Sequence, residues 1–350
     1  MGTYHSCNYN GVIFIMARIP RRCKGESAIG HRARAAHHPC RWRAAGAHSP
    51  DDGVGPRHYR AHRTERRAGT GDSAMGELTG KVAAITGGGN GIGRATAVRF
   101  AEEGAAGIVV ADLLDEPAAE TVALVEAAGG AAVAVHLDAT SRSDNEAMVA
   151  AAVDRFGRLD VVVTAAGIST ADYRSGDQEV ARKTMMSAID NLGTPWVPLL
   201  DLSADDFQRV LDVNLTGTLL ALQAGASHMV DTQTKGSIIT LASILAKHAD
   251  GPLPYNVSKA VVWMLTKVAA RALAPTGVRV NAIGPGYIDT NMTAMFGEVE
   301  GVLDVFLTQI PMGRLGTPVE VADTAVFLAS ERSSYFTGEI LHPDGGFYTE

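Results

Sequence analysis

The chain has 350 residues, of which 46% are hydrophobic and 20% are charged, and its formal net charge is −7. These values suit a soluble globular protein with a full-sized core, arranged as one large domain or two. All three cysteines lie before residue 75, which excludes a disulfide framework for residues 75–350. That part has no feature that requires an oxidising compartment, so we expect a cytoplasmic protein.

Residues 1–74 differ from the rest of the chain in charge and in pattern. They hold 13 of the 31 Lys and Arg residues but only 5 of the 38 Asp and Glu residues, so their net charge is +8 against −15 for the remainder. They lack a sustained period of 2 or 3.6 residues, and the apolar run Val12–Ala17 is too short to span a bilayer. We predict a disordered basic leader, which is a transit peptide, a nucleic-acid-binding arm or an over-long reading frame that starts properly at Met75.

We prefer the over-long reading frame, because the first predicted strand begins only a few residues after Met75. The leader has little means of burying a core of its own. We therefore expect residues 75–350 to form a single domain that folds, oligomerises and functions without the leader. Cys7, Cys23 and Cys40 lack the close pairing of zinc sites, so we predict no metal site. Neither a membrane nor a nucleic acid is an expected partner.

From residue 81 onward, short apolar runs alternate with amphipathic stretches. We predict strands at Val82–Ile85, Ile108–Ala111, Ala131–Leu137, Leu159–Val163, Ser237–Leu241, Val278–Ile283 and Glu339–Leu341. We predict helices at Ile92–Glu103, Glu116–Ala128, Asp144–Phe156, Ala204–Met229, Tyr255–Leu273 and Val319–Ser330, the last one opened by a capping box that runs from Thr317 to Glu320. Continuous apolar strands that alternate with helices indicate a doubly wound α/β domain, with a parallel sheet covered on both faces.

Five glycines fall within Thr86–Gly93, between the first predicted strand and the first helix. In a doubly wound sheet this turn faces the ligand crevice, and the helix N-terminus offers free N–H groups to a phosphate, although a plain tight turn is the alternative. Asp112 follows at about the distance expected for a carboxylate that binds an adenosine ribose, or else it caps the next helix. An acid there repels a 2′-phosphate, and neither Asn90 nor Leu113 supplies a cation. We therefore predict NAD over NADP.

Tyr255 and Lys259 stand four residues apart in a predicted helix and so share one face. Tyrosine has a free pKa of about 10, so its use as a base near pH 7 requires nearby positive charge worth about 4 kcal/mol. Lys259 and an oxidised nicotinamide ring are both candidates for that charge. An isolated pair of this kind is more often an interfacial tyrosine with a solvated lysine. Here the pair follows the fifth strand, which leads to Ser243 at the expected crevice.

Together these residues resemble the short-chain dehydrogenase/reductase family. The resemblance covers about residues 78–347 and rests, in family order, on TGGGNGIG, Asp112, Asp138, Asn214 in DVNLTG, Ser243, YNVSK, PGYIDT and the closing DGG. It implies a Rossmann-type fold with a seven-stranded parallel sheet and helices on both faces, and a homodimer or homotetramer. It also implies hydride transfer between NAD(H) and a secondary alcohol or ketone.

The resemblance implies a role for each matching residue. Tyr255 would be the general acid/base, Lys259 would hold the nicotinamide ribose and lower the pKa of the tyrosine, and Ser243 would hydrogen-bond the substrate oxygen. Asn214 would support a water-linked proton relay to Lys259, and Asp138 would contact the adenine. The other implied cofactor contacts are Gly87, Asn90, Gly91, Ile92, Gly93, Ala166, Gly167, Pro285, Gly286, Ile288 and Thr290, the last two at the carboxamide end of the nicotinamide.

Three features depart from the family pattern. The family's Asn-Asn-Ala-Gly is replaced by the sequence Thr-Ala-Ala-Gly at residues 164–167, and the gap from Ser243 to Tyr255 is one residue short. The stretch between Gly167 and Asn214 is longer than usual, with extra residues over about 169–200, including Met185, Met186 and Trp196. This insertion is a substrate cap, an oligomer contact or a plain surface excursion.

Two other functions compete with an NAD-dependent dehydrogenase. One is an NADPH-dependent ketoreductase of the 3-oxoacyl carrier-protein type, which a basic residue at position 90 or 113 would have favoured. The other is a non-catalytic NAD-binding regulator, against which the intact Ser243, Tyr255, Lys259 and Asn214 argue. An apolar substrate pocket, or simply core, is expected around Ile244, Leu245, Met292, Met295 and Phe296.

Overall fold

The computed structural model describes residues 76–173, 178–191, 193–249, 251–294 and 302–349, together with four residues near the start of the chain. The chain divides into two compact units, Met1–Arg67 and Ala68–Glu350. The described residues of the first unit form two short antiparallel strands, β1 (Asn8–Tyr9) and β2 (Val12–Ile13). The rest of the basic leader lies outside the described residues, so our expectations for it stay predictions.

The second unit is built on one parallel sheet with the strand order β5-β4-β3-β6-β7-β8-β9. Its strands are β3 (Val82–Thr86), β4 (Gly107–Asp112), β5 (Ala132–His136), β6 (Val161–Thr164), β7 (Ser237–Leu241), β8 (Arg279–Ile283) and β9 (Ile340–Leu341). The order changes direction between β3 and β6, so the loops that follow these two strands diverge and leave a crevice at the carboxyl edge of the sheet. The predicted doubly wound, seven-stranded sheet is confirmed.

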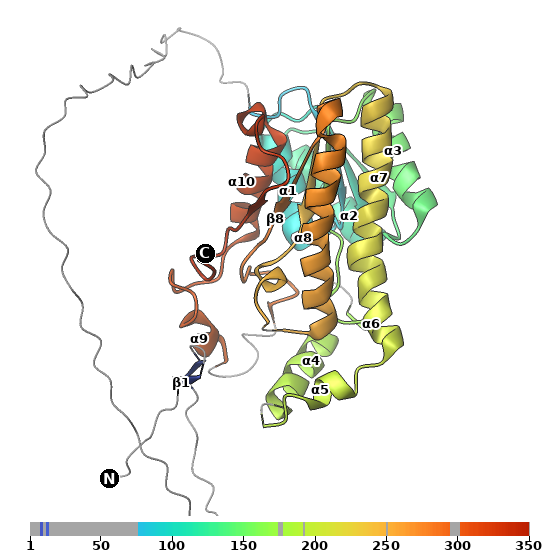
Figure 1. Cartoon of the computed structure of the whole chain (residues 1–350). Helices are drawn as coiled ribbons and strands as arrows, with labels where there is room; N and C mark the ends of the chain where they lie inside the picture. The colour runs from blue at the N-terminus through green and yellow to red at the C-terminus, as the bar shows by residue number, and fades with distance from the viewer. Residues whose placement is uncertain are drawn as a thin grey trace, which may run out of the picture. The chain divides into compact units, whose positions relative to one another are not determined.

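Helices cover both faces of this sheet. One face packs against α1 (Gly91–Glu102), α2 (Asp115–Ala127) and α10 (Pro318–Ala329), and the other against α3 (Arg142–Phe156), α7 (Gly217–Asp231) and α8 (Leu253–Leu273). Figure 1 shows α7 and α8 side by side in front of the sheet. In β3, Ile85 joins the first core with Phe100 of α1, whereas Ala84 joins the second with Met148 of α3. Both faces are therefore dry, which is why the strands are continuous apolar runs.

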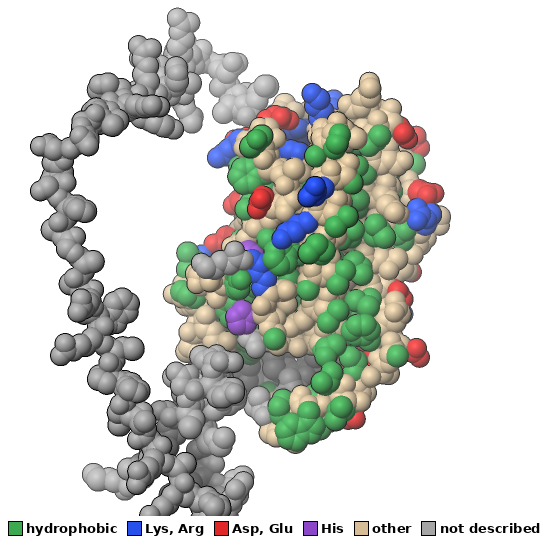
Figure 2. Space-filling view, in the orientation of Figure 1, with side chains coloured by type: hydrophobic (Ala, Val, Ile, Leu, Met, Phe, Trp, Pro, Cys, Tyr) green, Lys and Arg blue, Asp and Glu red, His purple; other side chains and the backbone are tan. Residues whose placement is uncertain are grey.

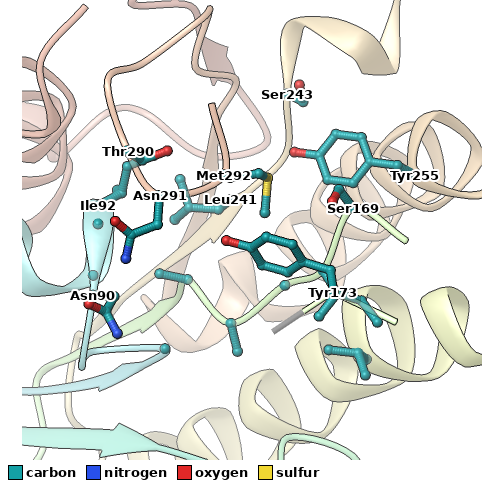
Figure 3. A pocket seen from close by; sticks show the side chains of 18 of the residues that line it. Asn90, Ile92, Ser169, Tyr173, Leu241, Ser243, Tyr255, Thr290, Asn291 and Met292 are labelled. Carbon is teal, nitrogen blue, oxygen red and sulfur yellow. The ribbon is translucent and has the colours of Figure 1, made fainter. Parts of the chain in front are cut away.

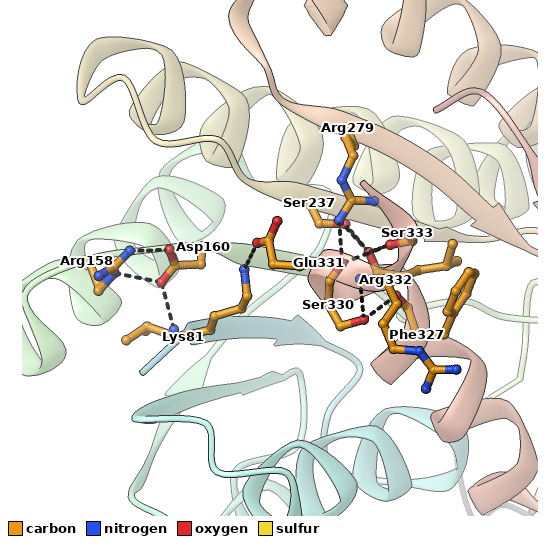
Figure 4. Close-up of polar contacts among 12 residues, drawn as sticks. Lys81, Arg158, Asp160, Ser237, Arg279, Phe327, Ser330, Glu331, Arg332 and Ser333 are labelled. Carbon is orange, nitrogen blue, oxygen red and sulfur yellow. Dashed lines mark hydrogen bonds and ion pairs between the residues drawn. The ribbon is translucent and has the colours of Figure 1, made fainter. Parts of the chain in front are cut away.

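Polar contacts fasten the amino edge of the sheet, opposite the glycine loop (Figure 4). Asp160 is buried, accepts the N–H of Val82 at 2.9 Å and pairs with Arg158 at 2.6 Å. Arg279 of β8 donates to the carbonyl oxygen of Leu328 at the end of α10, at 2.8 Å. These contacts fix the strands at the amino edge of the sheet, opposite the crevice.

Two regions differ from the predicted elements. The helix predicted over Ala204–Met229 is interrupted, because α6 (Ala204–Leu211) is joined to α7 by a π-helical turn at Asp212–Thr216. The region of the insertion, where no helix was predicted, contains α4 (Gln178–Asp190) and α5 (Val197–Leu200). A further short helix, α9 (Val302–Leu307), precedes α10. Across the described residues, every helix is too short or too polar to cross a membrane.

Candidate active site

The glycine loop between β3 and α1 has no room for side chains. Gly87 has a φ of +64°, and a Cβ there would lie 2.7 Å from the backbone nitrogen of Ala166. A Cβ on Gly93 would lie 2.1 Å from the carbonyl oxygen of Gly87. Asn90, which precedes α1, makes no side-chain hydrogen bond to the first turn of this helix. The loop therefore presents bare backbone to the crevice, as a phosphate-binding loop requires.

Asp112 ends β4 and braces the glycine loop from the neighbouring strand. Its carboxylate accepts the N–H of Gly89 at 2.8 Å and the N–H of Leu114 at 3.0 Å. Leu114 is the residue that precedes α2, so Asp112 also supports the start of that helix. The two roles considered from the sequence are compatible, because a carboxylate has acceptor positions beyond the two used here.

The segment after β6 lies between the glycine loop and the Tyr255–Lys259 pair. The N–H of Ala166 donates to the hydroxyl of Thr86 at 3.2 Å, which ties this segment to the glycine loop. A Cβ on Gly167 would lie 3.2 Å from Oδ1 of Asn214 and 3.5 Å from Nζ of Lys259. The replacement of Asn-Asn by Thr-Ala therefore leaves the close approach at Gly167 in place.

Asn214 sits in the π-helical turn and is fully buried. Its side-chain amide donates to the carbonyl of Ile168 at 2.9 Å and accepts the N–H of the same residue at 2.8 Å. The amide also donates to the hydroxyl of Ser258, at 2.9 Å. Asn214 thus links the end of β6 to α8, but its side chain is behind the cavity and does not line it.

Ser243 and Tyr255 lie near each other in the cavity (Figure 3), which Lys259 also lines. Ser243 acts on the phenol of Tyr255 as a hydrogen-bonding group and lowers its pKa. Lys259 is 5% exposed, donates from Nζ to the carbonyl of Leu241 at 2.8 Å, and places Nζ 5.6 Å from the centre of the Tyr255 ring. The two side chains share one face of α8, as their spacing predicts.

Burial opposes charge on both members of the Tyr–Lys pair. It raises the pKa of Tyr255 to about 12, while the hydrogen bond from Ser243 lowers it and the phenol of Tyr173 raises it further. Burial also lowers the pKa of Lys259 to about 8. Burial is the largest effect on the pKa of both groups, and the expectation that Lys259 lowers the pKa of the tyrosine stays a prediction.

The opposite wall comes from the segment after β8. The carbonyl of Pro285 accepts the N–H of Ile244 at 3.1 Å, which joins this wall to the turn after Ser243. Ile288 is buried and pairs with Gly316 in an isolated parallel bridge. Met292 lines the cavity together with Ile244 and Leu245, whereas Met295 and Phe296, also expected in the pocket, lie outside the described residues.

These walls enclose a cavity of about 420 Å³. Every predicted site residue except Asn214 lines it: Gly87, Asn90, Gly91, Ile92, Gly93, Asp112, Asp138, Ala166, Gly167, Ser243, Tyr255, Lys259, Pro285, Gly286, Ile288 and Thr290. The sequence analysis missed Ser169, Tyr173 and Arg209, which line it too. Ser169 could have been expected from its place soon after β6, since residues that follow a strand of a parallel sheet lie at its ligand edge.

The fold and the cavity define a Rossmann-type nucleotide-binding protein, and comparisons identify the family. The profile described as short chain dehydrogenase matches residues 81–300. The chain is 37% identical to the short-chain reductase protein NovJ of Streptomyces niveus, over 76% of this chain and 93% of that protein. It is also 37% identical to the 2,5-dichloro-2,5-cyclohexadiene-1,4-diol dehydrogenase LinX of Sphingobium indicum, over 77% of this chain and 97% of that one.

Solved structures agree with this assignment. The crystal structure of a short-chain type dehydrogenase/reductase from Mycobacterium marinum has a TM-score of 0.65 and 32% sequence identity, covering 78% of this chain and 97% of that one. The chain belongs to the short-chain dehydrogenase/reductase family. It is an oxidoreductase that acts on CH–OH groups with a nicotinamide cofactor, NAD(H) or NADP(H).

The lowered pKa of Lys259 predicts a pH dependence of stability. Between pH 8 and 10.5 the unfolded chain keeps a proton that the folded protein has released, so the contribution of Lys259 to stability rises with pH. The free energy of unfolding of the wild type, minus that of Lys259→Met, should rise by roughly 3 kcal/mol from pH 7.5 to 10.5. Urea unfolding of the cofactor-free proteins measures this difference, and a value that does not change with pH would contradict the assigned environment.

Proposed function

We propose that the protein transfers a hydride between NAD(H) and a secondary alcohol or ketone, with Tyr255 as the general acid/base. The observation that carries this proposal is that Ser243, Tyr255 and Lys259 line the same cavity as the glycine loop. The residues fit a dinucleotide, because the bare loop offers backbone N–H groups to a phosphate and Asp112 and Asp138 lie farther along the same cavity.

In the oxidative direction, the substrate carbon loses a hydride and the substrate oxygen loses a proton. When bound, the nicotinamide ring accepts the hydride and, in its oxidised form, carries positive charge. Tyr255 takes the proton as the phenolate and becomes the neutral phenol, and Ser243 holds the substrate oxygen in place. In the reductive direction the neutral phenol of Tyr255 returns the proton to the carbonyl oxygen, a role that its raised pKa suits.

Lys259 orients the groups at the site and exchanges protons with them. Its ammonium group is fixed by the carbonyl of Leu241, within reach of a bound ribose and of Tyr255. A pKa of about 8 allows it to exchange protons near neutral pH. Asn214 supports this relay by position, because its bond to Ser258 anchors the turn of α8 that carries Tyr255 and Lys259. A water-linked proton relay from Asn214 to Lys259 is part of this proposal.

Tyr255→Phe should remove nearly all turnover, because the phenol both contacts the substrate oxygen and exchanges its proton. Steady-state oxidation of a panel of secondary alcohols, with NAD and with NADP, measures the effect. Cofactor binding, followed by fluorescence titration of NADH, should change little, because the aromatic ring and Lys259 remain. A Tyr255→Phe protein with near-normal turnover would show that another group moves the proton.

The preference for NAD rests on the charge around Asp112. Its carboxylate lines the cavity, and the neighbouring lining residues Leu113 and Asn90 carry no charge. A 2′-phosphate there would meet a negative charge, whereas a free 2′-hydroxyl could donate to it. This argues for NAD, and against the NADPH-dependent ketoreductase as the alternative.

The double substitution Asp112→Ala with Leu113→Arg should shift the ratio of kcat/KM for NAD to that for NADP toward NADP. It removes the repulsive carboxylate and adds a phosphate partner. Leu113→Arg alone is the matched control and should give a smaller shift. An unchanged ratio in the double variant would mean that Asp112 only braces the glycine loop and the start of α2.

Members of this family are commonly oligomeric, and α8 offers a surface for a second copy of this chain. Its apolar side chains Leu253, Val257, Val261, Met264 and Val268 are between 37% and 60% exposed and recur every three or four residues. Figure 2 shows hydrophobic side chains spread over the face where α7 and α8 lie. A homodimer or homotetramer would bury this stripe.

Charge on the stripe should therefore prevent assembly. Val261→Glu with Val268→Glu should convert the oligomer to a monomer in sedimentation velocity, because two carboxylates would have to be buried unpaired. Leu124→Glu, at an exposed position on α2, is the matched control and should leave assembly unchanged. An oligomer that survives the double substitution would place the interface elsewhere.

A further inference from the structure

The inserted region contributes a second phenol to the cavity. We infer that Tyr173 is a substrate-binding residue, which selects alcohols and ketones that carry a second hydroxyl or carbonyl oxygen. This inference rests on the proposed function, because it concerns the substrate of the same site. It assigns a role to the start of the segment that extends from Gly167 to α4.

Backbone hydrogen bonds hold the segment that leads to Tyr173. Its side chain is 4% exposed, and its N–H donates to the carbonyl of Thr170 at 3.1 Å. The carbonyl of Ala171 accepts from Nε of Arg209 on α6, at 3.1 Å. Ile168, earlier in the same segment, is fixed by Asn214. These contacts fix the backbone that carries Tyr173.

Tyr173 faces the reacting groups. In Figure 3 its ring projects into the pocket that Tyr255 and Ser243 also line. The two phenols are close enough for Tyr173 to raise the pKa of Tyr255 electrostatically. A substrate oriented by Ser243 and Tyr255 must therefore pass within reach of the phenol of Tyr173.

The chemistry of the three hydroxyl groups divides their roles. Ser243 acts on the phenol of Tyr255 as a hydrogen-bonding group, and both serve the oxygen at the reacting carbon. Tyr173 comes from a different segment, so its hydroxyl is placed for another oxygen of the same molecule. Ile168, Leu241 and Met292 also line this pocket. Among apolar side chains, a polar group left without a hydrogen-bond partner is costly, so a hydrogen bond to the phenol of Tyr173 would discriminate strongly between substrates with and without a second oxygen.

A purely structural role for Tyr173 predicts a different outcome from a binding role. If the ring only packs as a wall of the cavity, phenylalanine replaces it equally well for every substrate. If the hydroxyl binds substrate, its loss weakens the binding of only those substrates that carry a second oxygen. One uncharged hydrogen bond corresponds to about a tenfold change in kcat/KM or in Kd.

Tyr173→Phe should therefore be compared with the wild type on cyclohexanol, cyclohexane-1,2-diol and cyclohexane-1,4-diol. We expect kcat/KM for at least one diol to fall about tenfold, and that for cyclohexanol to change less than about twofold. Tyr335→Phe, at a fully exposed position, is the matched control and should match the wild type on all three. Equal changes for cyclohexanol and both diols would overturn the inference.

Binding supplies a second measurement that does not depend on turnover. Calorimetry with the full-length protein saturated with NADH should show at least one diol bound several-fold more tightly than cyclohexanol, and the difference should vanish in Tyr173→Phe. Equal affinities in the wild type would overturn the inference. A diol that binds in this selective way but is never oxidised by the wild type with NAD or NADP would instead contradict the proposed function and leave the role of Tyr173 standing.

Discussion

The side-chain amide of Asn214 holds together the parts of the chain that meet at the site. It exchanges two hydrogen bonds with the backbone of Ile168, in the segment after β6, and gives a third to Ser258 on α8. Tyr255 and Lys259 flank Ser258 on that helix, so their distance from the glycine loop depends on this amide. A buried amide with its polar atoms satisfied is stable, whereas the same amide without partners would be costly. This explains why a π-helical turn, which is uncommon, is retained at Asp212–Thr216.

Dry packing governs the chemistry as well as the fold. The core that excludes water from both faces of the sheet continues to the wall where Lys259 and Tyr255 lie. There burial keeps the phenol of Tyr255 neutral and lowers the pKa of the Lys259 ammonium group. If Tyr255 is the general acid/base, its raised pKa suits proton donation to a carbonyl better than proton removal from an alcohol. Positive charge from the oxidised cofactor would restore the balance, so binding of NAD and activation of the tyrosine would be coupled.

The accuracy of the sequence analysis depended on how local each signal was. The seven strands lie within two residues of their predicted bounds, and the capping box of Thr317 and Glu320 is confirmed, since each depends on neighbours close along the chain. The π-helical turn within the helix predicted over Ala204–Met229 was missed, because the apolar period of the sequence continues through this turn. Tyr173 was missed as well, since no periodicity or motif distinguishes a pocket tyrosine from an exposed one.

The sequence alone was enough to predict the seven strands, the six helices that cover the sheet, the glycine loop at residues 87–93, and the shared face of Tyr255 and Lys259. These follow from backbone sterics and helix geometry over a few residues. Only the tertiary structure decided that Asn214 bonds Ile168, 46 residues away, and that Tyr173 faces Tyr255. It also decided that burial raises the pKa of Tyr255 instead of lowering it, because desolvation depends on every chain segment that closes around the side chain.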